Sequence, residues 1–433
     1  MNENETGSVA ILPDNSDHEC PQCVVFEMRV VLINPPSLFL NIPNAYPPTG
    51  LLYLGAALEA KGAEVEIVDL CDDPNWEQTV KGLGGNIFGV TCVTPNYNSA
   101  KKIINLLPED SIKMIGGAHA TALPQETFKD LKCHVIAGEG EEMIYDVAQD
   151  EVPKLWNCGL VDVNKYPIPA RHLVDVRRYE PEMTGGKSTS IYTSRGCPYN
   201  CNFCFKITGS IIRYRNKDNV IAEIVDCRDN YGIKNFVFGD DNFLLNRKRV
   251  MGLVKELDCL DINFKCIGRS DLVDKEYLQF LFDHGCTEIN YGVESGSQRI
   301  LDLMNKRERV KDSKNAILWA KEVGLVVKAF FIVGFPGEDE TSIQETKKFI
   351  LETQPHKWLL SQFVPLPGSD VFKYPEKYGI TWISQNWDDY VLVGRGGKGG
   401  ITFETKDLNK ERLIRMHDDL HNFLMDTLGD MGR

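Results

Sequence analysis

Length, composition and charge exclude several classes of protein. The chain has 433 residues, of which 42% are hydrophobic and 25% charged, as in a globular protein with room for two or three cores. A net charge of −14 argues against broad binding to nucleic-acid backbones. No apolar run reaches the ~20 residues that span a bilayer, so we expect no membrane partner. The acidic N-terminus lacks the basic-then-apolar order of a secretion signal, and thirteen cysteines without one indicate the reducing cytoplasm.

Residues 1–27 are expected to form a disordered tail, because they are polar and carry no periodic apolar pattern. Cys20 and Cys23 stand two residues apart within it. Two cysteines at this spacing supply only half of the ligands of a metal site. A disordered tail is therefore expected, and an accessory metal site or redox pair is the alternative.

Residues 28–149 alternate between strand-like and helix-like segments. The predicted strands are 29–36, 63–70, 86–94, 111–119 and 133–141, with helices such as 50–62 and 98–108 between them. The strands are continuously apolar and end in Gly, Pro, Asn or Thr, which is typical of a parallel sheet buried on both faces. We therefore predict a flavodoxin-like, doubly wound α/β domain with ligand-binding loops at the carboxyl ends of its strands.

Residues 150–186 are predicted to be a linker between two domains. The segment 166–171 is rich in proline and 180–186 is rich in turn-forming residues, so little regular structure is expected. Such a linker can hold two domains at a fixed separation.

Three thiols lie within eight residues of one another, at Cys197, Cys201 and Cys204. Gly196 and the intervening Pro and Asn residues suit a tight loop around one inorganic centre. Cysteine thiolates hold iron–sulfur clusters, usually four to a cluster, so three ligands would leave one iron open. Zinc is the competing interpretation, but structural zinc sites are closed by four ligands and no neighbouring residue completes this one. Three unliganded thiols are the remaining alternative.

From residue 187 to 373 the strand–helix alternation restarts. The predicted strands are 189–194, 235–241, 264–270, 288–295, 326–335 and 358–366, and the predicted helices are 218–230, 247–260, 274–284, 297–323 and 339–353. Six such units predict a partial (β/α)6 barrel of the TIM type. Chemistry in such barrels lies at the carboxyl ends of the strands, which is where the cysteine loop falls.

Residues 374–433 change in character and are predicted to form a short C-terminal cap that closes the barrel and shapes a substrate pocket. The glycine-rich segment 394–400 could cradle an anion, although a flexible loop is the plainer alternative. Residues 408–428 predict an amphipathic helix. His417 and His421 lie one turn apart on it, and without a third ligand we expect a solvated face instead of a metal site.

The cysteine run, with aromatic Phe203 before its last thiol, resembles the signature of the radical S-adenosylmethionine (SAM) superfamily. In that family three cysteines hold a [4Fe–4S] cluster whose open iron binds the amino and carboxylate groups of SAM. Electron transfer from the cluster then cleaves SAM to a 5′-deoxyadenosyl radical. The resemblance covers roughly residues 29–370, and four further motifs follow in the family's order.

Those motifs imply a SAM site at the strand ends. The implied SAM-binding residues are Gly239, Asp240, Asp241, Arg269, Ser270, Glu294, Ser295, Gly334, Pro336 and Gly337. Asp240 and Asp241 would meet the ammonium group, the next four would border the carboxylate and ribose, and the last three would lie along adenine. The alternatives are an acidic helix N-terminus, a helix cap at Ser295 and a plain Gly-Phe-Pro-Gly turn.

The loops of the first domain resemble the cobalamin-binding domain that is fused to many radical SAM enzymes. The implied cobalamin contacts are Pro48, Gly50, Leu51, Thr91, Gly116, Gly117, His119, Gly138, Glu139 and Gly140. The Asp-x-His-x-x-Gly motif that supplies a histidine to cobalt elsewhere is absent, so His119 is expected only at the periphery of the cofactor. The alternative is a degenerate domain that retains the sheet as a scaffold.

Together the resemblances imply a cobalamin-dependent radical SAM enzyme. It would methylate an unactivated carbon of a small-molecule or peptide substrate and receive electrons from a donor such as flavodoxin or ferredoxin. No protein general base is assigned, because hydrogen-atom abstraction does not require one. The alternatives are a radical SAM oxidoreductase, cyclase or rearrangement enzyme, an enzyme like the tRNA methylthiotransferases, and a non-catalytic cobalamin or iron–sulfur sensor.

Overall fold

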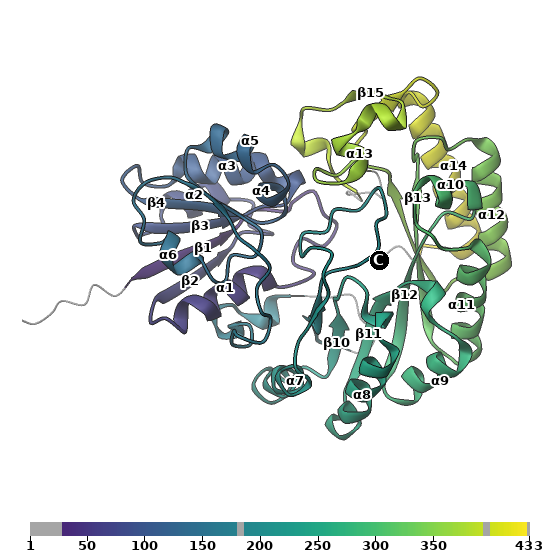
Figure 1. The fold of residues 1–433 in the computed structure, drawn as a ribbon, viewed down its shortest axis with the longest axis horizontal. Helices are drawn as coiled ribbons and strands as arrows, with labels where there is room; N and C mark the ends of the chain where they lie inside the picture. The colour runs from purple at the N-terminus through teal and green to yellow at the C-terminus, as the bar shows by residue number, and fades with distance from the viewer. Residues whose placement is uncertain (1–27, 180–185, 393–398, 431–433) are drawn as a thin grey trace, which may run out of the picture.

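The computed structural model describes residues 28–179, 186–392 and 399–430, and Figure 1 shows their arrangement. Within these residues the chain forms two six-stranded sheets, each wholly parallel, and two short two-stranded sheets. The predicted α/β class is confirmed. The predicted tail with Cys20 and Cys23 lies outside the described residues, as does most of the glycine-rich segment 394–400.

The first sheet has the doubly wound topology that the sequence predicts. Its strands, in spatial order, are β2 (Glu64–Asp69), β1 (Arg29–Asn34), β3 (Ile87–Thr91), β4 (Ile112–Gly116), β5 (His134–Ala137) and β6 (Leu155–Asn157). The first five are the predicted strands. The sixth was not predicted: it lies in the linker, which we expected to lack regular structure, and Leu155 pairs with Val135 to extend the sheet.

Side chains alternate between the two faces of this sheet, and helices cover both. Val31 and Ile33 pack with α2 (Trp76–Lys81), α3 (Tyr97–Leu106), α4 (Ala118–Ala122) and α5 (Pro124–Leu131). Val30 and Leu32 point the other way, toward α1 (Thr49–Glu59) and α6 (Ile144–Val147). Burial on both faces explains why the central strands β1, β3 and β5 are largely apolar.

The second sheet curls into the predicted half-barrel (Figure 1). Its strands, in spatial order, are β7 (Ser188–Ile191), β10 (Asn235–Phe238), β11 (Asn263–Gly268), β12 (Cys286–Glu294), β13 (Val326–Val333) and β14 (Lys357–Gln362). The helices α7 (Lys217–Tyr231), α8 (Arg247–Leu257), α9 (Lys275–Asp283), α11 (Val310–Glu322) and α12 (Glu340–Thr353) alternate with them along the chain. Strand order follows chain order, as in a (β/α) barrel.

The single helix predicted over 297–323 is wrong. The chain forms α10 (Gln298–Leu303), then leaves the helix, and resumes at α11. Asn305 and Arg307 have positive φ values of 51° and 56°, and the side chains between and after them, Lys306 and Glu308, are buried. The helix breaks because this loop turns charged side chains into the protein.

The C-terminal region packs over both large sheets. It contains α13 (Asp370–Lys373), the antiparallel pair β15 (Ile380–Ile383) and β16 (Phe403–Thr405), and α14 (Lys410–Leu428). The expectation of a solvated histidine face on α14 is wrong for His417, which is buried. Its ring lies 5.8 Å from that of His421, which in turn meets Trp358 edge-on. Of the helices described, none is both long and apolar enough to cross a membrane.

One carboxylate ties the linker, the half-barrel and the first domain together. Glu223 on α7 lies 2.7 Å from Arg171 of the linker and 2.5 Å from Arg215, and the side chains of Glu223 and Arg171 are fully buried. Arg171 also donates to the carbonyl of Ser190 on β7, and Arg215 to the hydroxyl of Tyr53 on α1. Buried charges of this kind must be paired.

We predict that Glu223→Gln lowers the free energy of unfolding by about 3–5 kcal/mol, because it leaves two buried cations without their counter-charge. Urea unfolding followed by circular dichroism measures the loss. The matched control is Glu256→Gln, which removes a surface pair with Lys217 and should cost less than about 1 kcal/mol. Equal losses in the two variants would contradict the prediction.

Candidate functional site

The cysteine loop follows β7 and the short strand β8 (Ser194–Arg195). Gly196 enters it with a φ of 98°, and a Cβ atom there would lie 2.3 Å from the carbonyl oxygen of Ile211. Only glycine avoids that clash. Inside the loop, the N–H of Cys204 donates to the carbonyl of Cys201 and the N–H of Cys197 donates to that of Gly209. The chain is thus folded back on itself around the three thiols.

The three thiols lie close enough to influence one another. Burial raises the pKa of Cys204 to about 12, and the charges of Cys201 and Cys197 add to the rise. A bound metal supplies positive charge and reverses this preference for the neutral thiol. Among the described residues, no three His, Cys, Asp or Glu side chains converge on one ion. A four-iron cluster does not need such convergence, because each thiolate binds a different iron, so this donor set fits a cluster.

The predicted SAM-ammonium ligand Asp240 is held by donors of the protein itself. Its carboxylate is buried and accepts from the backbone N–H groups and the hydroxyls of both Thr193 and Ser194. Burial raises its pKa to about 6. With these four donors Asp240 clamps the turn between β7 and β8, and its predicted contact with SAM stays a prediction. The ring of Tyr192 lies against Gly239, where a Cβ atom would be only 2.9 Å from it.

Asp241 lies on the other side of the same turn and is exposed. It accepts from the N–H of Gly196 at 3.0 Å and from the hydroxyl of Thr208 at 2.7 Å. It therefore fixes the entrance of the cysteine loop. Because this carboxylate faces the cysteine loop from an exposed position, it remains a candidate for the SAM ammonium group.

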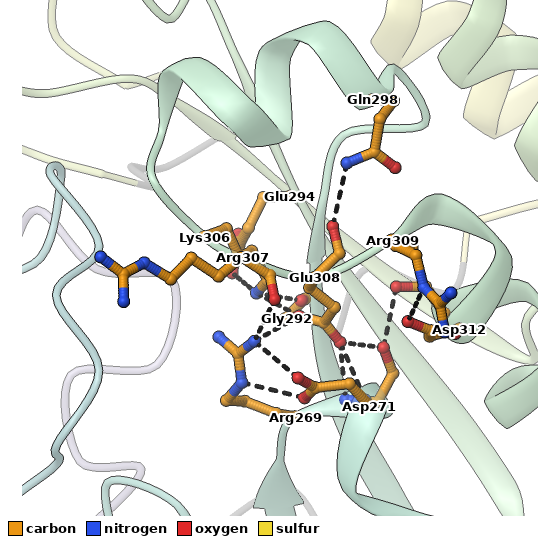
Figure 2. A network of polar contacts seen from close by, with 12 residues as sticks. Arg269, Asp271, Gly292, Glu294, Gln298, Lys306, Arg307, Glu308, Arg309 and Asp312 are labelled. Atoms are coloured by element: carbon orange, nitrogen blue, oxygen red, sulfur yellow. Dashed lines mark hydrogen bonds and ion pairs between the residues drawn. The ribbon is translucent and has the colours of Figure 1, made fainter.

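Arg269, Ser270 and Glu294 belong to one polar network at the ends of β11 and β12 (Figure 2). Glu308, whose side chain is fully buried, accepts from the N–H of Ser270 at 2.8 Å. Lys306 lies 3.3 Å from Glu308 and 3.1 Å from Glu294. Arg269 forms a bidentate pair with Asp271, at 3.0 and 2.9 Å.

Sequence reasoning missed Lys306 and Glu308, because both fall in the segment predicted as one helix. The available signal was the charge pattern, since residues 305–309 interrupt the apolar stripe on which that helix depended. Ser295 lies apart from the network and does not cap α10, whose N-cap residue is Ser297. Its hydroxyl accepts from the N–H of Ser297 and lies 3.3 Å from the hydroxyl of Thr346.

The motif after β13 forms a closed turn. Gly334 and Gly337 have φ values of 88° and 92°, and the N–H of Gly334 donates to Glu338 at 2.5 Å. Glu338 is buried, and burial raises its pKa to about 8. Pro336 is also buried. Glycine is required here by the backbone, which is compatible both with a plain turn and with close approach to a flat base.

Six of the predicted cobalamin contacts line one cavity at the carboxyl edge of the first sheet. They are Leu51, Thr91, Gly116, Gly117, Gly138 and Gly140. A Cβ atom on Gly117 would lie 2.5 Å from the carbonyl oxygen of Cys92, and one on Gly138 equally close to that of Cys158. Both glycines have positive φ. The cavity is thus walled mainly by bare backbone and aliphatic side chains, so that a bound group can approach the backbone closely.

The other four predicted contacts do not line this cavity. Pro48 and Gly50 lie at the start of α1. His119 is buried, with its ring stacked on Tyr97 at 4.0 Å and edge-on to Trp387 at 4.9 Å. Burial lowers its pKa to about 4. His119 thus joins the first domain to the C-terminal region, and its expected place at the cofactor's periphery stays a prediction.

Glu139 likewise turns away from the predicted site. It accepts from the N–H of Val161 at 2.8 Å and from Arg213 at 2.9 Å, and it lies 3.3 Å from Arg195. Arg195 reaches Glu141 as well, at 2.7 Å. Because Arg195 stands two residues before Cys197, these pairs attach the cysteine loop directly to the glycine loops of the first sheet. Sequence reasoning missed both arginines and Glu141 in this role.

Two family models match this chain, one over each large sheet. The model of the radical SAM superfamily matches residues 191–350, and the model of the B12 binding domain matches residues 37–148. This chain therefore carries a domain of the radical SAM superfamily. It carries a B12-binding domain ahead of that radical SAM domain.

Named relatives of this radical SAM protein include methyltransferases and a cyclase. An uncharacterized methyltransferase of Pyrococcus horikoshii is 28% identical, over 84% of this chain and 87% of its own length. The anaerobic magnesium-protoporphyrin IX monomethyl ester cyclase of Cereibacter sphaeroides is 25% identical, over 80% of this chain and 63% of its own length. The solved structure of the radical SAM methyltransferase TsrM from Kitasatospora setae, with cobalamin and a [4Fe–4S] cluster bound, superposes with a TM-score of 0.71. That likeness, at 16% identity, covers 92% of this chain and 89% of TsrM and shows the shared fold.

We predict that His119 makes stability depend on pH in the acid range. Its pKa is about 4 in the folded protein and returns to 6.5 on unfolding, so the unfolded state binds more protons between these values. The stability contributed by the neutral ring is therefore complete above pH 6.5 and is lost as the pH falls toward 4.

Urea midpoints at pH 7 and pH 5 test this prediction. His119→Phe keeps an aromatic ring between Tyr97 and Trp387 but cannot titrate, so its midpoint should fall less than that of the wild type. His172→Gln, at the mainly exposed His172, serves as the control and should fall as the wild type does. If the urea midpoint of His119→Phe falls between pH 7 and pH 5 by as much as that of the wild type, the assignment is refuted.

Proposed function

We propose that this protein is a cobalamin-dependent radical SAM methyltransferase that methylates an unactivated carbon of a small-molecule or peptide substrate. The observation that carries the proposal is the pairing of Arg195, beside the cysteine loop, with Glu139 and Glu141, beside the glycine cavity. When bound, the cluster and SAM supply the radical chemistry and cobalamin carries the methyl group. The protein's part is to hold the two cofactor regions at a fixed separation and to exclude water.

The proposed cluster ligands are Cys197, Cys201 and Cys204. For SAM, the support is the position of the polar network and of the Gly334–Gly337 turn at the carboxyl ends of neighbouring strands. We assign Asp241 to the side of the ammonium group and Glu294 to the side of the ribose and carboxylate. Asp240 is assigned the structural role of holding the turn before the cysteine loop.

The proposed domains are a B12-binding domain at 28–149, a linker at 150–186, a radical SAM half-barrel at 187–373 and a cap at 374–433. The separate cores of the two large sheets support this division. The proposed reductant is a donor such as flavodoxin or ferredoxin, because the cluster must receive one electron for each SAM cleaved.

The second candidate is a radical SAM cyclase or oxidoreductase, which the similarity to the magnesium-protoporphyrin ester cyclase favours. Both candidates use the same cofactors, so the fate of SAM's methyl group separates them. Transfer leaves the methyl group in the product, whereas cyclisation leaves it in methionine.

The function is tested with methyl-labelled SAM. We expect the reconstituted enzyme, reduced with dithionite and loaded with cobalamin, to yield 5′-deoxyadenosine and to transfer the label into a product from a small-molecule extract. Mass spectrometry follows the label, and an extract incubated without enzyme is the control. Unlabelled products with continued release of 5′-deoxyadenosine would favour the cyclase. A cluster-loaded enzyme that cleaves SAM but never retains cobalamin would refute the proposal.

We further predict that Cys197→Ala, Cys201→Ala and Cys204→Ala each abolish cluster assembly and SAM cleavage, because only two thiolates remain. Iron content, visible absorbance and 5′-deoxyadenosine yield measure the effect. Cys259→Ala, at an exposed thiol outside the loop, is the matched control and should behave as the wild type, as should Cys20→Ala and Cys23→Ala. Cobalamin retention should persist in all of them, since its cavity is lined by the first domain. A Cys201→Ala protein with a complete cluster would overturn the ligand assignment.

A further inference from the structure

The loop between α10 and α11 is docked onto the cysteine loop. The N–H of Asn202 donates to the carbonyl of Met304 at 2.9 Å, and the side-chain amide of Asn202 donates to Leu303 at 3.0 Å. In the other direction, the side-chain amide of Asn305 donates to the carbonyl of Asn200 at 2.6 Å. Two turns of chain, far apart in sequence, are thereby held face to face.

Two cations stand where these turns meet. The guanidinium of Arg269 lies over the ring of Tyr199, 3.9 Å from its centre, inside the cysteine loop. Lys306 is buried, with its ammonium group between the carbonyl of Gly292 and the carboxylates of Glu294 and Glu308 (Figure 2).

Lys306 remains charged in this environment. Burial alone would lower its pKa, but the neighbouring Glu294 and Glu308 outweigh burial and raise it. The same charges reach the cysteine loop. Lys306 follows Asn305, whose side-chain amide donates to Asn200 next to Cys201, and Arg269 lies over Tyr199 of the same loop.

The stability of the fold does not require a lysine at position 306. Its neighbours Asn305 and Arg307 both have positive φ, and a non-glycine residue held in that region costs about 1–3 kcal/mol. Buried ion pairs replaced by apolar side chains of similar volume are often as stable or more stable. A buried ammonium in a strained loop beside Cys201 therefore indicates a role for the charge itself.

We propose that Lys306 is a positioning residue that fixes a positive charge beside Cys201 and thereby raises the reduction potential of the cluster, while Glu294 lowers it. A nearby cation stabilises the electron added on reduction, and in a water-poor site the effect is strong. The inference rests on the proposed ligation by Cys197, Cys201 and Cys204. Lys306 is then the residue that makes reduction of the cluster easier.

The test is an anaerobic redox titration of the reconstituted protein without SAM, followed by the electron paramagnetic resonance signal of the reduced cluster. In Lys306→Met we expect the ratio of reduced to oxidised cluster at a given potential to fall about tenfold, which corresponds to about 59 mV for one electron. Lys306→Arg keeps the charge and should titrate near the wild type. The matched control is Lys314→Met, which removes a partly exposed lysine that pairs with Glu352 at 2.9 Å.

A second variant tests the sign. Glu294→Gln removes a negative charge and should move the potential upward, opposite to Lys306→Met, which a purely structural role does not explain. Unchanged potentials in both variants would overturn the proposal, as would equal loss of iron in Lys306→Met and Lys306→Arg. If Lys306→Met does not fold, the shift in Glu294→Gln decides. Failure of the proposed function itself shows separately, as a wild-type protein that assembles no cluster or a Cys201→Ala protein that assembles a complete one.

Discussion

The arrangement of both proposed cofactor regions depends on the ion pairs that Arg195 makes with Glu139 and Glu141. The side chain of Arg195 is 16% exposed and those of the two glutamates 6%, so these charges are held largely away from solvent, where pairing is strong. Arg195 is two residues from the first cluster thiol, and the glutamates flank Gly140 at the rim of the glycine cavity. A reaction that passes a group between two cofactors needs them at one separation, because small misplacements cost rate steeply. These pairs supply that constraint.

Two further ties make the same separation rigid. At one place, Glu223 forms ion pairs with Arg171 of the linker and Arg215 of the half-barrel. Arg215 in turn donates to the hydroxyl of Tyr53 in the first domain. At another, the cap returns to the first domain, where Trp387 meets His119 and Asp388 accepts from Asn98 at 3.1 Å. The described part of the linker, residues 150–179, thus has a strand of its own, β6, and a buried arginine, Arg171. We infer that cap and linker act on the cofactor regions by holding the two sheets together.

Periodicity and strand-end residues predicted most of the fold. Strands such as β1 and β13 are continuous apolar runs, and the glycines at 117 and 138 marked places where backbone approaches backbone. The spacing of residues could not give the direction of a side chain at a strand end. Asp240 and Glu139 stand where ligand-binding acids are expected, but donors from distant segments, Thr193 in one case and Arg213 in the other, occupy them. Lys306 was missed for the converse reason, since its partner Glu294 lies in another strand and local sequence favoured a helix.

The acids at the strand ends therefore divide into two kinds. Asp240 and Glu308 each accept from backbone N–H groups and are buried, so they fix the ends of strands. Glu294 differs, because its φ of 63° places a non-glycine residue in a rare conformation at the end of β12, and its contact there is an ammonium group. Strain of this kind persists only where surrounding structure enforces it, and it gathers at ligand sites. Glu294 and Lys306 are thus the charged pair at the cysteine loop that contributes least to holding the structure together. In our proposal the two charges act with opposite sign on the reduction potential of the cluster.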